Sequence, residues 1–246
     1  MATRSTVLLK IDKALGFQSI AGESKVRLLP SPWPSNALPP PTASLLSIAS
    51  RKGLLAAAGP DSVILASTES VRQAFSSGGE GNPKSFTPQL ILNLGIRVSQ
   101  VAFSADEDHL IISAEQGGGL AVYNVQALMQ GNTEPAFELP TNNIGIRSLV
   151  PNPTAEKAEL VAVVTSNGGL MMANLQTREF CIGAQGLIMK EGVSCVSWSN
   201  KGKQLVAGLG DGTCLQLTPE GLGKAEIPKP LALEGDQHGM LPCLDR

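Results

Sequence analysis

The stretch Val193–Leu217 most constrains the fold, because apolar and polar residues alternate along it and two tight turns interrupt it. The pattern predicts strands at Val193–Ser199, Gln204–Gly208 and Thr213–Leu217. Asp211-Gly212 between apolar strands is a strong hairpin signal, since a tight primed turn needs positive φ at its centre. A three-stranded meander of this size cannot bury both of its faces alone, so it requires similar units beside it.

Three further copies of this unit precede it in the chain. The residues that close the first strand of each copy, Ser50, Ser104, Asn152 and Ser199, are 54, 48 and 47 positions apart. Self-similarity at this period, with about four strands in each copy, is typical of a β-propeller. The strands expected in the earlier copies are Ser44–Ser50, Leu54–Ala58 and Ser62–Ala66, then Val98–Ser104, His109–Ser113 and Leu120–Asn124, then Ile146–Val150, Glu159–Thr165 and Gly169–Asn174.

We therefore predict an all-β protein, a β-propeller with degenerate WD-like repeats and about four blades present. None of the copies carries the Gly-His and Trp-Asp pairs of ordinary WD repeats. Short apolar stretches between the copies are candidate outer strands, and we expect two longer inserts, one of them with a helical turn around Ala127–Met129. The candidate outer strands are Gln89–Leu94, Ala136–Leu139, Phe180–Ile182 and Ala225–Ile227, and the other insert is the Gly/Ser/Pro-rich Ser70–Pro88.

The predicted organisation is a leader at 1–14, a partial propeller at 15–238 and a divergent tail at 239–246. Leu15-Gly16-Phe17 and Lys25–Leu29 are expected to form one or two short strands at its start. Two alternatives stay open: four blades that close into a ring, or an arc of a larger ring. The predicted repeat units are about 15–70, 89–124, 136–174 and 180–220, and a further blade begins at 225–238.

The composition argues against several classes of function. The chain is 42% hydrophobic and 16% charged with a net charge of −2, so it offers no basic surface for nucleic acid or a membrane. No apolar run approaches the roughly 18 residues of a membrane span, and the first ten residues lack the apolar core of a signal peptide. We therefore expect a soluble intracellular protein with no direct nucleic-acid binding and no membrane insertion.

The four cysteines and two histidines lack the spacing of a zinc site. Cys195 and Cys214 fall inside expected strands and are interpreted as small core hydrophobes, whereas Cys181 and Cys243 are unassigned. His238 is interpreted as a surface residue. We accordingly expect no metal ligand, no cofactor and a reducing compartment.

No catalytic constellation is present in the sequence. There is no G-x-S-x-G elbow, and the glycine-rich stretches Gly117–Gly119 and Gly208–Gly212 lie between strands, where they predict turns and not phosphate loops. His109 follows the acidic turn Asp106–Asp108 and is interpreted as part of a solvated turn. We predict that the chain is not an enzyme and assign it no catalytic, cofactor-binding or metal-binding residue.

Two acidic clusters, Asp106–Asp108 and Glu156–Glu159, are open to two interpretations. They are either docking points for a basic partner or ordinary solvated turns. No partner-binding residue can be assigned from the pattern.

Several strings occur in the order found in one family of proteins. The strongest is Val196–Leu205 (VSWSNKGKQL), followed by Gly208 and Asp211-Gly212-Thr213. This ordered set resembles the N-terminal propeller of the cytoplasmic-face FG nucleoporin, the fungal 159-kDa and vertebrate 214-kDa nucleoporin family. The other matching strings are Leu15-Gly16-Phe17, Lys25-Val26-Arg27, Ser44-Leu45-Leu46, Asn152-Pro153, Ile227-Pro228 and Asp236 with His238.

The resemblance implies a seven-bladed, non-enzymatic scaffold domain of the nuclear pore complex. It implies partners, namely the DEAD-box RNA helicase of messenger-RNA export and other nucleoporins, and a location at the cytoplasmic face of the nuclear envelope. The chain departs from the family because it ends after about four blades, and the helicase-docking loops of the family lie chiefly on later blades. The alternatives are a generic WD-like propeller adaptor in another protein complex and a propeller hydrolase with polar groups at its channel.

Overall fold

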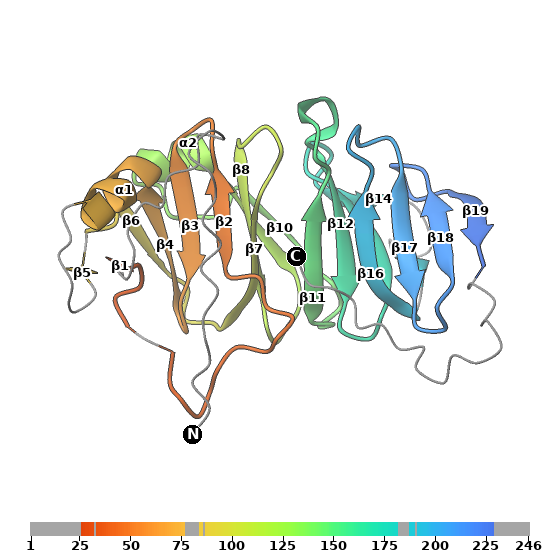
Figure 1. The fold of residues 1–246 in the computed structure, drawn as a ribbon, viewed down its shortest axis with the longest axis horizontal. Coiled ribbons are helices and arrows are strands. Elements are labelled where there is room, and N and C mark those ends of the chain that lie inside the picture. The colour runs from red at the N-terminus through yellow and green to blue at the C-terminus, as the bar shows by residue number, and fades with distance from the viewer. Residues whose placement is uncertain are drawn as a thin grey trace, which may run out of the picture.

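The strands form four antiparallel sheets that stand side by side in chain order (Figure 1). The computed structural model describes residues 26–31, 33–76, 84–85, 87–181, 187–189 and 191–228. The first and fourth sheets lie at opposite ends of the row, so the described residues form an open arc and not a closed ring (Figure 1). The predicted all-β class and the repeated unit are confirmed, and a total of seven blades stays a prediction.

The first and second sheets are meanders in which successive strands pair antiparallel. Each begins with an inner strand, and the inner strands of neighbouring sheets lie next to each other. The first sheet consists of β2 (Leu46–Ala49), β3 (Leu54–Ala58), β4 (Ser62–Ser67) and β6 (Leu90–Asn93), and the second of β7 (Val98–Phe103), β8 (His109–Ala114), β9 (Leu120–Asn124) and β10 (Phe137–Leu139).

The third and fourth sheets repeat this plan, and the third carries one extra strand that the sequence did not predict. The extra strand, β15, pairs with β13 beyond the end of β14. The third sheet consists of β11 (Ile146–Pro151), β12 (Leu160–Thr165), β13 (Leu170–Asn174), β14 (Glu179–Cys181) and β15 (Leu187–Met189), and the fourth of β16 (Val193–Trp198), β17 (Leu205–Leu209), β18 (Cys214–Leu217) and β19 (Gly223–Ile227).

Strand pairing corrects the predicted boundaries of the repeat units. The units were expected to begin at 89, 136, 180 and 225, but β6, β10, β14 and β19 each pair with a strand of the preceding sheet. The stretch expected to begin a further blade therefore closes the fourth sheet, because a tight turn at Thr218–Gly221 folds β19 back onto β18. The outer limits of the propeller, with the leader 1–14 and the tail 239–246, fall outside the described residues and stay a prediction.

A short additional pair of strands lies apart from the four sheets. The strand expected at Lys25–Leu29 is β1 (Val26–Arg27), and it pairs in parallel with β5 (Lys84–Ser85) instead of joining the first sheet. Leu15-Gly16-Phe17 lies outside the described residues.

Neighbouring sheets share one apolar core at each junction. One cluster joins the first and second sheets, another the second and third, and another the third and fourth. Strands in the middle of the row are consequently buried on both faces, and β12 (LVAVVT) is buried at every position. In β17 the pattern differs, because only the face toward the third sheet, with Leu205 and Ala207, is fully buried.

Side chains of the inner strands link the second sheet to the third and the third sheet to the fourth through backbone carbonyls. A register shift occurs in β7, β11 and β16, at Ser99, Arg147 and Ser194 respectively. The Ser99 hydroxyl donates to the Ile146 carbonyl, and the Arg147 guanidinium donates to the carbonyls of Val193 and Ser194 at 2.7 and 2.6 Å. These bonds fix the order and spacing of the sheets at their inner edge.

The family-like residues of the third and fourth sheets hold the junction between these sheets. Asn152 is fully buried, and its amide donates to the Gly202 carbonyl at 2.9 Å. Gly202 has φ +61, and a Cβ at this position would overlap the Asn152 amide. The Trp198 indole N–H donates to the Val150 carbonyl at 2.8 Å. Asn152 and Gly202 are therefore buried structural residues, whereas Asn200, Lys201 and Lys203 of the same turn are exposed.

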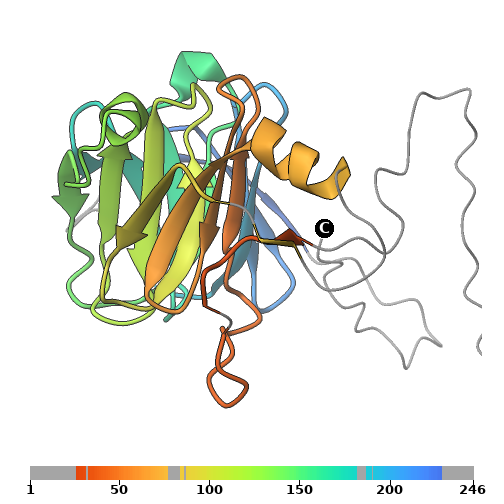
Figure 2. The same cartoon turned by 90° about the vertical axis from the view of Figure 1, so that its left-hand side faces the viewer.

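Helices occupy the two long inserts. The expected helical turn is confirmed as α2 (Val125–Met129), which the Asn124 side chain caps at the Ala127 N–H. The other insert was expected to be an irregular loop, but its first part is a helix, α1 (Thr68–Ser76). Figures 1 and 2 show α1 at the end of the row, where Val71 packs on the outward face of the first sheet. A short 3₁₀ helix, Ala155–Lys157, precedes β12.

The glycine-rich stretches form turns, as predicted. Gly117, Gly118 and Gly119 all have positive φ between β8 and β9. Gly212 has φ +90 between β17 and β18, and the Asp211 carboxylate accepts a hydrogen bond from the Thr213 N–H at 2.9 Å. Neither stretch opens a helix, so neither has the geometry of a phosphate loop.

Candidate docking surface

The first acidic cluster, Asp106–Asp108, has one buried residue. It forms the turn between β7 and β8, where Glu107 is buried at the junction with the first sheet. The Glu107 carboxylate accepts hydrogen bonds from the backbone N–H groups of Arg51 and Lys52 at 3.1 and 2.8 Å. Asp108 pairs with the Lys52 ammonium at 2.7 Å, and this hydrogen bond holds the pKa of Asp108 below its ordinary value. Two of the three acidic residues therefore have cationic or N–H partners in the first sheet.

The third residue of that cluster, Asp106, lies on the opposite side of the turn. It lines a groove of 410 Å³ between the second and third sheets together with Glu159 of the second acidic cluster. The structure therefore brings the two clusters together, which the sequence could not show because they are about 50 residues apart. We call this site the acidic groove. Its side chains come from Asp106, His109, Asn124, Ala136, Phe137, Ala155, Ala158, Glu159, Leu175, Gln176 and Arg178.

The acidic groove combines an aromatic wall with charges of both signs. The Arg178 guanidinium lies 5.3 Å from the centre of the Phe137 ring, in a cation–π contact between two residues that line the groove. Arg178 has φ +58, a conformation that non-glycine residues adopt rarely and that here belongs to the turn before β14. The sequence did not single out Phe137 or Arg178 as site residues, because one belonged to an expected outer strand and the other to a connecting turn.

Asp106 is held in place by its own turn. Its carboxylate accepts hydrogen bonds from the Ser104 hydroxyl and from the Asp108 N–H, the latter at 3.1 Å. The same Ser104 hydroxyl accepts from the His109 N–H at 3.0 Å, which orients the start of β8. Two carboxylates and one guanidinium line the groove, and this excess of negative charge suits a basic group of a partner better than an acidic one.

The other residues considered for function have structural or unassigned positions. Glu156 lies exposed in the 3₁₀ helix, and the neighbouring Lys157 pairs with Glu220 at 3.1 Å. His238 and Cys243 lie outside the described residues. Within the described ranges, no group of three or more His, Cys, Asp or Glu residues could hold a metal ion. A search of the same ranges finds no helix with the length and apolar character to cross a membrane.

The repeated sheets and their junctions match a known domain family. The family model described as NUP159/214 beta propeller matches residues 39–244. The chain belongs to the NUP159/214 β-propeller family. This result confirms the resemblance carried by the motif around Trp198 and by Asn152-Pro153.

Curated members of the family are nucleoporins from fungi and animals. The chain is 54% identical over 228 residues to nucleoporin NUP159 of Chaetomium thermophilum, a match that covers 92% of this chain and 15% of the relative. It is 25% identical over 200 residues to nucleoporin nup146 of Schizosaccharomyces pombe, covering 79% and 14%. Human Nup214 is 28% identical over 222 residues, covering 86% and 10%. The matched part of the chain thus corresponds to between 10% and 15% of the length of these relatives.

Solved structures support the fold. The crystal structure of the N-terminal domain of Nup159 aligns with a TM-score of 0.56 at 18% identity, covering 79% of this chain and 46% of that chain. A Saccharomyces cerevisiae structure titled as Dbp5 bound to Nup159, Gle1, IP6 and ADP aligns with a TM-score of 0.59 at 18% identity, covering 82% and 48%. At this identity the likeness concerns the propeller fold of the family.

Proposed function

We propose that this chain is a nucleoporin propeller that recruits the DEAD-box RNA helicase of messenger-RNA export to the cytoplasmic face of the nuclear pore complex. The observation that carries the proposal is family membership, together with 54% identity over 92% of the chain to a fungal NUP159. A solved structure of Dbp5 bound to Nup159 supports the choice of partner. The same family favours a pore scaffold over a generic propeller adaptor in another complex.

The proposed role is one of binding and not of catalysis. The relatives are nucleoporins, and the groups gathered in the acidic groove are two carboxylates, a histidine, two amides and a guanidinium without a serine or cysteine nucleophile among them. We propose that the helicase supplies the ATPase chemistry and that this domain supplies a rigid surface. Other nucleoporins are further expected partners.

The test is a binding assay between the purified chain and the export helicase of the same organism. We expect saturable capture that weakens as salt rises, because docking on carboxylates is screened by salt. A double variant, Asp106→Asn with Glu159→Gln, should weaken capture by about tenfold if the acidic groove takes part. The control is Glu191→Gln with Glu226→Gln, which removes the same number of charges from exposed positions outside the groove.

Two outcomes would contradict the proposal at different levels. Equal capture by the groove variant and the control would show that the acidic groove is not part of the helicase interface, although the proposed recruiting function would still stand. Failure of the folded chain to bind the helicase would overturn the recruiting role.

A further inference from the structure

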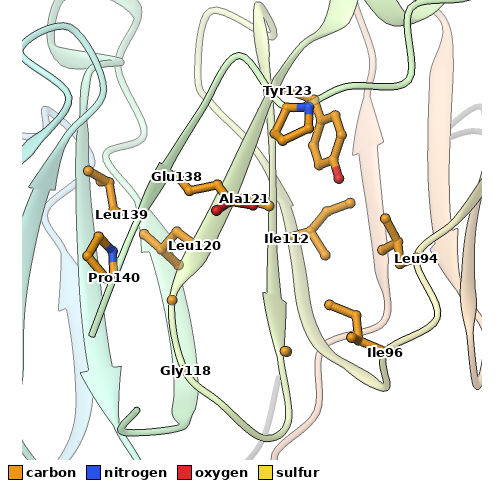
Figure 3. A pocket seen from close by; sticks show the side chains of 13 residues that line it. Leu94, Ile96, Ile112, Gly118, Leu120, Ala121, Tyr123, Glu138, Leu139 and Pro140 are labelled. Atoms are coloured by element: carbon orange, nitrogen blue, oxygen red, sulfur yellow. The ribbon is translucent and has the colours of Figure 1, made fainter. Parts of the chain in front are cut away.

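A second groove, separate from the acidic groove, lies between the first and second sheets. It has a volume of 510 Å³, and its walls come from the end of the first sheet and from the outer half of the second (Figure 3). Leu94 and Ile96 form one side, and Ile112, Ala121 and Tyr123 of β8 and β9 form the other. Ile96 is 47% exposed, so this apolar surface is accessible at the rim. We call this site the rim groove.

The rim groove exists because one position of the second sheet is small. Ala121 pairs with Ile112 across β9 and β8. The register places Met171 and Leu215 at the corresponding positions of the third and fourth sheets, opposite Val163 and Ala207. Met171 and Leu215 pack into the cores that join their sheets to the preceding ones. In the second sheet the methyl group of Ala121 leaves this volume open, and Gly118 and Gly119 add no side chains to fill it.

The charge at the edge of the rim groove is negative. Glu138 of β10 pairs with Ala121, lines the groove and is exposed to solvent (Figure 3). None of the ion pairs among the described residues involves Glu138. Burial raises the pKa of the Tyr123 phenol, and the nearby carboxylates of Glu138 and Glu134 raise this pKa further. The groove is therefore an apolar recess beside an uncompensated carboxylate.

We propose that the rim groove binds a short peptide segment of a partner protein, with a leucine-like side chain over Ala121 and an adjacent lysine or arginine paired with Glu138. The apolar recess would provide the binding free energy, and the carboxylate would set the direction in which the peptide lies. This inference is independent of the helicase-docking role, because the two grooves lie on opposite faces of the second sheet.

The chain offers a direct reporter, since Tyr123 is its single tyrosine. We would label the full chain with ¹³C-tyrosine and follow this one set of signals during titration with the peptide acetyl-Ser-Leu-Lys-Ser-amide. We expect saturable shifts of the Tyr123 signals in the millimolar range, about 4 kcal/mol of binding free energy. Replacing leucine by alanine, or lysine by glutamate, in the peptide should weaken binding by about fivefold or more.

Two variants of the chain test the two halves of the proposal. Ala121→Met copies Met171 of the third sheet and should fill the groove and abolish the peptide-induced shifts. Glu138→Gln should weaken binding of the lysine peptide without changing the response to the leucine-to-alanine exchange. The control is Glu226→Gln, because Glu226 pairs with Leu215 as Glu138 pairs with Ala121, but in a sheet whose recess is filled.

Unchanged shifts in Ala121→Met, equal affinity for the lysine and glutamate peptides, or no shift in the unmodified chain would each overturn the proposal. If Ala121→Met does not fold, the Glu138→Gln variant and the exchanged peptides decide the question, because neither changes the core.

Discussion

Glu107 shows how a single residue can have a role that its surroundings in the sequence conceal. It has φ +65, whereas Gly53 and Gly202 occupy left-handed positions in the corresponding turns of the first and fourth sheets. A non-glycine residue in this conformation is strained, and here two backbone N–H groups of the first sheet hold its carboxylate. The acidic turn, which the sequence predicted to be solvated, thus joins the first and second sheets. We call the contact of the Glu107 carboxylate with the N–H groups of Arg51 and Lys52 the clamp.

The first prediction concerns this clamp. Glu107→Gln should lower the free energy of unfolding by about 1–3 kcal/mol, because the charged acceptor of two N–H groups becomes a neutral amide with one acceptor oxygen. Chemical denaturation of the variant and of Glu134→Gln, an exposed control, measures the difference. A loss no greater than that of the control would show that the clamp does not stabilise the junction.

The second prediction concerns pH. The hydrogen bond from Lys52 lowers the pKa of Asp108 in the folded protein, so the carboxylate stabilises the fold above the unfolded pKa of an aspartate, about 4. This contribution should be lost as pH falls through the lower, folded pKa. Because the side chain is 57% exposed, the effect should be below about 1 kcal/mol. Asp108→Asn should remove this part of the pH dependence in unfolding measured between neutral and acid pH, and an unchanged profile would contradict it.

At the scale of an element, α1 changes the end of the row of sheets. Glu69 contacts both Arg72 and Gln73, and Val71 and Phe75 lie one turn apart on the face toward the sheet. This helix covers apolar residues such as Ile64 that a sheet at the end of a row would otherwise expose. The Gly/Ser/Pro-rich residues later in the insert concealed the helix from sequence reasoning.

The third prediction tests that cover. Val71→Ser should destabilise the protein by about 1–3 kcal/mol, because a buried apolar side chain is replaced by a hydroxyl on an apolar face. Ser70→Ala, on the exposed side of α1, serves as the control. If thermal unfolding of the two variants coincides, the helix does not contribute to the stability of the first sheet.

At the scale of the whole molecule, the four sheets are linked in series by shared cores. Cys195 was expected to be a core residue, but it is exposed, because it lies on the face of β16 that points away from the third sheet. Cys214 is half-buried on the same face, whereas Cys181 packs against the core between the third and fourth sheets. Burial raises the pKa of the Cys181 thiol. Cys195 and Cys214 therefore both lie on the face of the fourth sheet that no other described sheet covers.

The fourth prediction follows from this difference. A small alkylating reagent at neutral pH should modify Cys195 at least about tenfold faster than Cys181, since reaction requires access and the thiolate form. Peptide mapping at short reaction times measures both rates, and denaturant should remove the difference. Faster modification of Cys181 in the folded chain would mean that the fourth sheet does not cover it.

Local patterns in the sequence determined the strands, their order and most turns, because alternation and the turn chemistry of residues such as Asp211-Gly212 act within a few positions. The helical turn of α2 belongs to the same class of signal. The ordered motifs also sufficed to indicate the family.

The tertiary structure alone decided which strands share a sheet and which residues meet between sheets. The outer strand β19 joins the preceding sheet, Asp106 and Glu159 meet in one groove, and Ala121 leaves another groove open. Each of these facts depends on packing between residues that lie far apart in the chain or on the neighbour that a sheet face receives. A local pattern specifies that a face is apolar, but it does not specify what will cover it.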